Sequence, residues 1–333
     1  MPCKKLTLCL TLTLSMTAVV SEGFELVTLG ETGGIKDGAT TAFLLRSATD
    51  DNYVALDAGT LVNGINVALD QGAFTHLRDD QKASGITNPV GYILKERVKG
   101  YMISHPHLDH VSGLLIASPD DSKKPIYSLP SVTRGLTDTY FNWIAWPNFS
   151  TEGKKPALSK YTYVHPTSDK ALPVAGTGLT VTAYPLSHAG MESTAFLLKD
   201  KKGNGVVYLG DVGADAVEKS DKLKKLWQVL APEIKAGRLK GMVIEASFAN
   251  ETPDHLLFGH LTPKWLLHEL TVLESLAGKG SLKGLDVVIS HVKYSLDKGD
   301  SVRNVIARQL KDGNTLGVEF IIPRQGEVIA LDD

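Results

Sequence analysis

The stretch Ser104-His105-Pro106-His107-Leu108-Asp109-His110 decides the fold of this chain, because it places three histidines and a carboxylate within six residues. It directly follows the apolar run 100–103, which is typical of a buried strand. An imidazole is costly to desolvate without a partner, so three of them this close together indicate a common ligand. A loop that leaves a strand can aim the first two histidines to one side and Asp109 with His110 to the other. The spacing therefore predicts a site for two adjacent metal ions.

Two metal ions need more ligands than this loop provides, and three later positions supply them. His188, Asp211 and His291 each stand where an apolar, strand-like run ends. Imidazoles and carboxylates are side chains that bind divalent transition metals in proteins. We expect the following assignment: one ion is held by His105, His107 and His188, the other by Asp109, His110 and His291, and Asp211 bridges both.

Strands and helices are mixed along the whole chain. The segment 193–210 predicts a hairpin, because Lys201-Lys202-Gly203-Asn204-Gly205 is a turn sequence between two strand-like runs, so the sheets are not purely parallel. A helix is predicted from Thr262-Pro263, a typical helix start, to Gly278, a typical end. The mixture indicates a layered α/β fold. Apolar runs that read as buried strands end just before Asp57, His105, Asp211, Glu245 and His291.

Composition limits the class of ligand. The chain has 333 residues, of which 43% are hydrophobic and 22% charged, so it is long and apolar enough to bury a sizeable core. Its formal net charge is -2, whereas a protein that binds long nucleic acid needs a basic face to neutralise many phosphates. We therefore expect no nucleic acid polymer as partner, and any anionic substrate to be a small molecule held locally by the metal ions.

The N-terminal segment has the pattern of a secretory signal peptide. Lys4 and Lys5 precede an uncharged, threonine-rich apolar run from Leu6 to Val20, and a small residue, Ser21, follows. A buried helix or a membrane anchor is the alternative, but an anchor needs about 20 apolar residues and this run is shorter. We expect residues 1–21 to be removed and 22–333 to form one catalytic domain, periplasmic or secreted, free of the membrane. Both cysteines lie in the removed segment.

The motif and the later Asp and His positions resemble the metallo-β-lactamase superfamily over most of the chain after residue 21. The stretch 105–119 also resembles the signature of class II cyclic nucleotide phosphodiesterases, and Gly259-His260-Leu261-Thr262-Pro263 is similar to that family. With an export segment, the chain is most similar to the periplasmic bacterial members. The resemblance implies a four-layer αββα sandwich with mixed sheets, and an enzyme that hydrolyses 3′,5′-cyclic AMP, with cyclic GMP as a second candidate substrate.

The resemblance also implies a mechanism. Two metal ions roughly 3.5 to 4 Å apart acidify a bridging water and offset charge on the phosphoryl oxygens, and the hydroxide attacks in line to give the 5′-monophosphate. Asp109 and Asp211 belong to the expected catalytic set as ligands, and His260 as a proton donor or phosphate contact; the alternative for His260 is a helix-start histidine bonded to backbone. The imidazole-rich set favours two zinc ions, with manganese or iron as alternatives.

Other assignments stay open at the level of sequence. A lactonase or β-lactamase of the same superfamily, or a non-catalytic metal- or nucleotide-binding module, are alternative functions. Asp57 is expected behind the metal ligands and Glu245 outside the catalytic set. The pattern carries no signal for an oligomeric state. The aromatic residues that either stack on a purine or belong to the core are Tyr140, Phe141, Trp143, Trp146 and Phe149.

Overall fold

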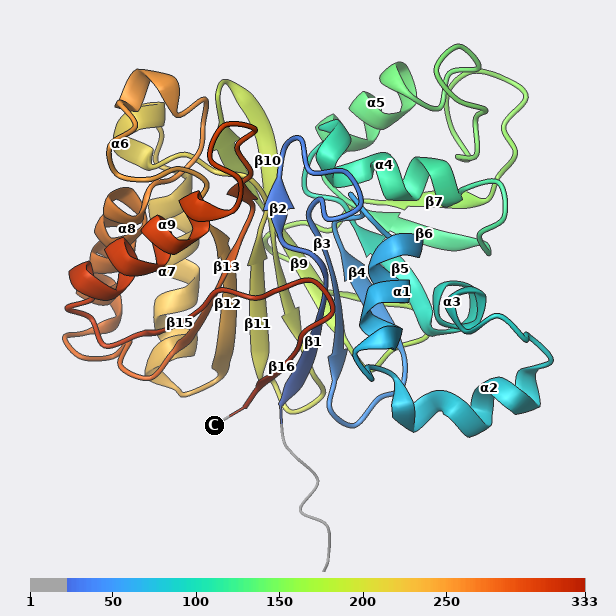
Figure 1. Ribbon diagram of the computed structural model, residues 1–333, viewed down its shortest axis with the longest axis horizontal. Helices are drawn as coiled ribbons and strands as arrows, with labels where there is room; N and C mark the ends of the chain where they lie inside the picture. The colour runs from blue at the N-terminus through green and yellow to red at the C-terminus, as the bar shows by residue number, and fades with distance from the viewer. Residues whose placement is uncertain (1–22, 333) are drawn as a thin grey trace, which may run out of the picture.

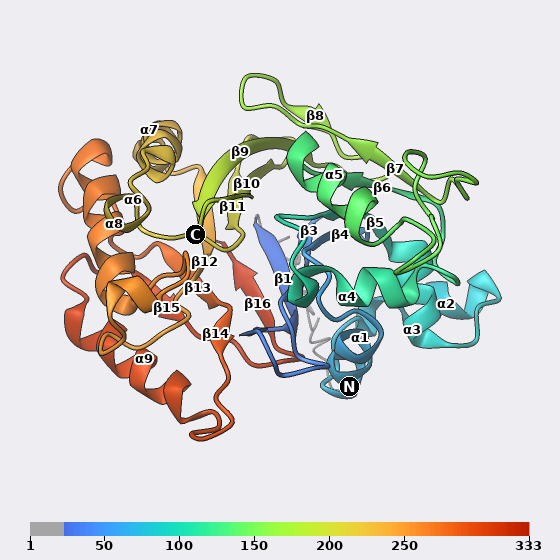
Figure 2. The same ribbon diagram turned by 90° about the horizontal axis from the view of Figure 1, so that it is seen from above.

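The structure is a computed structural model that describes residues 23–332. The expected signal peptide, residues 1–21, and both cysteines lie outside the described residues. Two seven-stranded sheets face each other at the centre, and helices cover the outer face of each (Figure 1). The view from above shows the same order of layers: helices, sheet, sheet, helices (Figure 2). The expected αββα sandwich is confirmed.

The first sheet has the strand order β16-β1-β3-β4-β5-β6-β7. Strands β4 to β7 run parallel to one another, and β1 is antiparallel to both β3 and β16. The helices α1 to α5 lie on the outer side of this sheet (Figure 1). The bounds are β1 Phe24–Gly30, β3 Ala42–Ser47, β4 Tyr53–Leu56, α1 Val62–Asp70, α2 Arg78–Ser84, α3 Pro89–Tyr92, β5 Val98–Met102, α4 Leu108–Ala117, β6 Lys124–Tyr127, α5 Pro130–Thr139, β7 Tyr161–Val164 and β16 Val328–Leu331.

The second sheet has the order β15-β13-β12-β11-β10-β9-β8. The predicted hairpin is present as β10 and β11, which pair antiparallel, while β11, β12, β13 and β15 are parallel. A short pair, β2 (Thr32–Gly33) with β14 (Val292–Lys293), joins segments from the two ends of the chain. The other bounds are β8 Leu172–Pro173, β9 Thr180–His188, β10 Met191–Lys199, β11 Gly205–Leu209, α6 Asp215–Glu218, α7 Lys222–Lys235, β12 Leu239–Glu245, α8 Pro263–Ala277, β13 Asp286–Ser290, α9 Ser301–Gly313 and β15 Glu319–Ile321.

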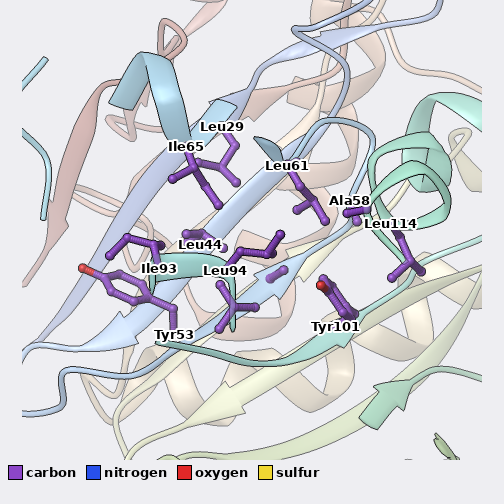
Figure 3. Packing of buried hydrophobic residues seen from close by; sticks show 14 of the residues in the cluster. Leu29, Leu44, Tyr53, Ala58, Leu61, Ile65, Ile93, Leu94, Tyr101 and Leu114 are labelled. Carbon is purple, nitrogen blue, oxygen red and sulfur yellow. The ribbon is translucent and has the colours of Figure 1, made fainter. Parts of the chain in front are cut away.

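Apolar side chains fill the three interfaces between the four layers. Leu44, Ile65 and Leu114 belong to the outer core of the first sheet, whose packing Figure 3 shows. Phe43 and Phe196 belong to the core between the sheets, and a third core lies under α7, α8 and α9. Each fully buried large side chain contributes about 1.5–3 kcal/mol to folding, so the three cores together hold the sheets face to face.

The predicted helix after Thr262 is confirmed as α8. The Thr262 side chain accepts a hydrogen bond from the Trp265 N–H at 3.3 Å, Pro263 occupies the first turn, and Gly278 follows the end. Within residues 23–332, no helix is long and apolar enough to cross a membrane. Parallel neighbours carry their C-terminal ends to the same edge of a sheet. The residues that follow β4, β5, β11 and β13 therefore collect at one edge of the sandwich.

Candidate metal centre

The structure brings all seven predicted metal ligands together at this edge. Four of them come from the loop and helix start after β5, and His188, Asp211 and His291 come from the second sheet. They form two groups in which the possible ligand atoms lie within 4.8 Å of one another. The first group is His105, His107, His188 and Asp211, and the second is Asp109, His110 and His291.

Asp211 lies between the two groups and is buried. Its Oδ2 atom is 3.1 Å from His291 Nε2 and 3.7 Å from His105 Nε2, and its Oδ1 atom is 3.3 Å from His110 Nε2. Although buried, the Nε2 atoms of His105 and His110 make no hydrogen bond within the described residues. Buried polar atoms are rarely left without a partner, so nitrogens of this kind beside a carboxylate fit a divalent cation. The cluster can bind metal.

The ring nitrogens that point away from the centre are held by other groups. His188 Nδ1 donates to the Gly259 carbonyl at 2.8 Å, which fixes the tautomer and leaves Nε2 directed at the site. His291 Nδ1 lies 2.9 Å from Ser247 Oγ, and His105 Nδ1 lies 3.0 Å from Ser104 Oγ. Such partners orient the imidazoles in advance, as metal-ligand histidines require.

Asp57 is a further partner of this kind and has four bonding groups around it. It is fully buried behind the first sheet's ligands and accepts bonds from the Ser104 N–H at 2.7 Å, the Ser104 hydroxyl at 2.6 Å and the Tyr208 hydroxyl at 2.5 Å. Its Oδ2 atom also lies 2.7 Å from His110 Nδ1. Asp57 thus contacts the predicted ligand His110 from the side away from the centre, where the sequence analysis expects it.

Burial and charge set the protonation of the site. Burial and the neighbouring His110 hold the pKa of His105 well below its usual range, and burial with His188 lowers the pKa of His107 to about 4. Burial alone would raise the pKa of Asp211, but the surrounding imidazoles, His110 first, outweigh it and lower that pKa well below its usual range. His105 and His107 are thus neutral and Asp211 is ionised, which are the forms that bind a metal ion. Asp211 and Asp57 outweigh burial at His110 and raise its pKa well above the usual range, so a metal ion that binds there would displace a proton.

His260 reaches the same centre from the loop before α8. Together with Asp211 and His291 it forms a third group with ligand spacing. However, its Nδ1 atom donates to Glu245 Oε1 at 2.9 Å, so that nitrogen is already occupied. The alternative of a histidine bonded only to backbone is wrong, because the partner of the ring is this carboxylate.

Glu245 was left outside the expected catalytic set, yet it is fully buried at the end of β12 and linked to the site. Besides His260, it accepts bonds from the Ser247 hydroxyl at 2.5 Å and from the Val212 and Leu261 N–H groups at 2.8 and 3.1 Å. The sequence signal is an apolar run that ends at Glu245, as the runs before Asp211 and His291 do; the strand order, with β12 between β11 and β13, shows that its end lies at the same edge.

The aromatic run after α5 belongs mainly to the core. Phe141 and Phe149 are buried in the outer core of the first sheet, as the alternative to purine stacking predicted. The Trp146 indole N–H donates to Ser118 Oγ at 3.0 Å, and that of Trp143 donates to the Pro156 carbonyl at 2.8 Å. Tyr140 is half-buried and donates to the Pro106 carbonyl at 2.9 Å, so it supports the histidine-rich loop.

Gly33 in β2 touches His291 in a way that only glycine permits. A Cβ built on Gly33 would overlap the His291 ring, because β2 pairs with β14 directly beyond that histidine. We expect Gly33→Ala to displace the ring and to lower activity and the affinity for one metal ion by roughly 10–100-fold. Metal analysis after dialysis and turnover assays measure this. Gly91→Ala, where a Cβ meets only ordinary contacts from 3.7 Å, is the matched control; equal behaviour of the two variants would contradict the prediction.

Comparison with known proteins identifies first the fold of this chain and then its family. The crystal structure of YhfI from Bacillus subtilis, described as a metallo-beta-lactamase fold protein, superposes with a TM-score of 0.57 at 17% identity, covering 92% of this chain and 99% of that chain. The chain thus has the metallo-β-lactamase fold, with a His/Asp cluster that can bind metal. Residues 24–326 match the family model of class-II cAMP phosphodiesterases. The chain belongs to this family.

Two individual proteins are similar to it over nearly their whole lengths. The 3′,5′-cyclic-nucleotide phosphodiesterase of Aliivibrio fischeri is 53% identical over 307 residues, which are 92% of each chain. The crystal structure of unliganded yeast PDE1 has a TM-score of 0.81 at 25% identity, covering 93% of this chain and 99% of that chain. The expected reaction, hydrolysis of a 3′,5′-cyclic nucleotide, is confirmed, and neither a lactonase nor a non-catalytic module is needed to explain the chain.

Proposed function

We propose that the chain hydrolyses 3′,5′-cyclic AMP to 5′-AMP with two divalent metal ions, for which the imidazole-rich donors favour zinc. The observation that carries this proposal is the pair of ligand groups with Asp211 between them. One ion would be held by His105, His107 and His188, the other by Asp109, His110 and His291, and Asp211 would serve both. Two such ions acidify a water molecule and offset negative charge on phosphoryl oxygens.

The chain's own residues hold this arrangement rigid. Asp109 Oδ2 accepts the Gly34 N–H at 2.6 Å and lies 3.2 Å from His291 Nε2, so its position is fixed from two directions. Asp211 is fixed by its place between the imidazoles, where it can orient an attacking water toward the phosphorus. Because these groups are already in place, little reorganisation is needed when the phosphate enters.

His260 is proposed to serve the leaving 3′-oxygen or a phosphoryl oxygen. Its Nδ1–H is directed at Glu245, which fixes the ring and leaves Nε2 for the substrate. The carboxylate also favours the proton on the ring, so a histidine with this partner suits proton donation. Glu245 acts through His260 and is a positioning residue.

We expect His260→Ala to lower kcat for cyclic AMP by roughly 10²–10⁴-fold with metal content intact, because a positioned proton donor contributes about that much. Glu245→Gln should lower kcat in the same direction, and the double variant should lose no more than His260→Ala alone, since the two residues act as one unit. Steady-state kinetics and metal analysis measure this. His268→Ala, an exposed histidine in α8, is the control. Loss of a metal ion in His260→Ala would make His260 a ligand instead.

Product analysis tests the proposed reaction directly. Purified protein with cyclic AMP should release 5′-AMP, turnover should stop after treatment with a chelator, and added zinc or manganese should restore it. Release of 3′-AMP, or turnover that survives complete metal removal, would overturn the proposed mechanism.

Export is proposed from the N-terminal segment alone. Its basic start, short apolar run and small residue near position 21 support removal of residues 1–21 and a periplasmic or secreted domain of 22–333. N-terminal sequencing of protein from periplasmic and cytoplasmic fractions tests this. A cytoplasmic protein that begins at Met1 would contradict it.

A further inference from the structure

A groove of about 740 Å³ opens beside the metal centre. Its lining comes from the loop 34–40, from 59–63 at the start of α1, and from 108–116 in α4. Four large apolar side chains in this lining are exposed to between 51% and 70%: Ile35, Val62, Leu108 and Ile116. Apolar side chains that gather in a concave surface, rather than singly, mark a ligand-binding or interaction site.

The groove is continuous with the metal centre. Asp109, one of the proposed ligands, forms part of its lining, and so does Gly34, whose N–H donates to Asp109 Oδ2 at 2.6 Å. On the other side of Gly34 lies Lys293, with its Nζ atom 3.8 Å from the position of a Cβ on Gly34. Within residues 23–332 this ammonium makes no ion pair or hydrogen bond. One end of the groove thus offers the proposed ligand Asp109, with the Lys293 ammonium next to Gly34 but outside the lining, and the remainder offers mainly apolar surface.

This arrangement, with charged groups at one end and apolar surface along the rest, matches the substrate of the proposed function, on which the inference rests. A cyclic nucleotide carries its single negative charge on the phosphate, and a flat, largely apolar base projects from the ribose beside it. With the phosphate at the metal centre, the base must lie on a neighbouring surface. Apolar side chains from α1, α4 and the loop 34–40 can cover a planar ring and remove it from water.

We propose that this groove is the nucleobase subsite, with Val62, Leu108 and Ile116 in contact with the purine and Lys293 near the phosphate. Its lining contains carboxylates and no lysine or arginine, so an extended polyanion is not its ligand. A second copy of the chain is the competing occupant, and the experiment below separates the two.

The test uses the metal-loaded protein and two ligands that differ only in the base, 5′-AMP and ribose 5-phosphate. We expect Ile116→Ser and Val62→Ser each to weaken 5′-AMP binding in calorimetry by roughly tenfold, since a lost apolar contact typically costs about that factor. The same variants should raise KM for cyclic AMP by a similar factor with little change in kcat. Ribose 5-phosphate binding and metal content should stay within twofold of the parent protein. Val328→Ser, an exposed valine in β16, is the matched control.

Three results would overturn the subsite. If the variants bound 5′-AMP and ribose 5-phosphate equally less tightly, the effect would lie at the phosphate. If they bound both ligands as tightly as the parent protein, the groove would have no part in binding. A dimer of the parent protein in sedimentation, lost in Ile116→Ser, would assign the groove to a second copy of the chain. Failure of the proposed function is distinct, because the parent protein would then not turn over cyclic AMP at all.

Discussion

Replacing Asp211 by alanine is expected to lower turnover of cyclic AMP by at least about 1000-fold. Even a residue that only supports a metal ligand typically contributes 10–100-fold, and Asp211 lies within 3.7 Å of ligand nitrogens from both groups. Without its carboxylate, the crowded imidazoles lose the negative charge that lies between the two groups. The affinity for metal should therefore decrease, and the attacking water should lose its orientation at the same time.

Metal analysis and kinetics under saturating zinc separate these two losses. Asp221→Ala removes an exposed carboxylate that forms only a surface ion pair with Lys225, and it should retain full activity. If Asp211→Ala kept normal turnover, Asp211 would not be the residue shared by both ions. If it kept both ions but lost turnover, its role would be confined to the reaction itself.

The second large effect is expected on stability, for Asp57→Ala. This substitution leaves two buried hydroxyls, a buried backbone N–H and the His110 ring without their common acceptor. Removing one partner from a buried charged network costs about 3–5 kcal/mol in the free energy of unfolding. Urea unfolding of metal-free protein measures this value without a contribution from bound metal.

Two graded variants serve as controls for Asp57. Tyr208→Phe removes one of the four bonds and should cost about 0.5–1.5 kcal/mol, the usual net value of a hydrogen bond. Asp57→Asn keeps the side chain's shape and suits the left-handed backbone of this residue, which has a φ of 52°, so its cost should lie between the other two. If Asp57→Ala destabilised no more than Tyr208→Phe, the carboxylate would not be the centre of the network.

That the seven side chains lie together could be predicted from the sequence, because they stand at or just after strand ends, and strand ends meet at an edge. The same rule placed Asp57 behind the ligands but could not give its partners, since Tyr208 reaches it from the opposite sheet. Glu245 was missed because a carboxylate at a strand end also suits a cap, and only the strand order shows that it meets His260. Local pattern predicts elements, whereas pairing across the sandwich determines these contacts.

The contact of Gly33 with His291 and the groove beside α4 could not be predicted for a related reason. Gly33 reads as a turn residue in Thr32-Gly33-Gly34, and nothing near it in sequence indicates a histidine ring from the other end of the chain. The exposed apolar residues of α1 and α4 resemble ordinary helix positions until the two helices and the loop 34–40 are seen to form one lining.

The proposed metal ligands are divided between the two sheets: the loop and helix start after β5 supply four, and the second sheet supplies His188, Asp211 and His291. Each of the two proposed ligand sets therefore takes residues from both halves of the sandwich. A pair of bound ions would therefore act as a cross-link between the halves, formed only after the sheets have docked, and late in folding. At a metal concentration 100 times its dissociation constant, each ion would add about 2.7 kcal/mol against separation of the halves. Protein without bound metal would thus be inactive and also less stable against separation of its two halves, and proteases would cleave it more readily.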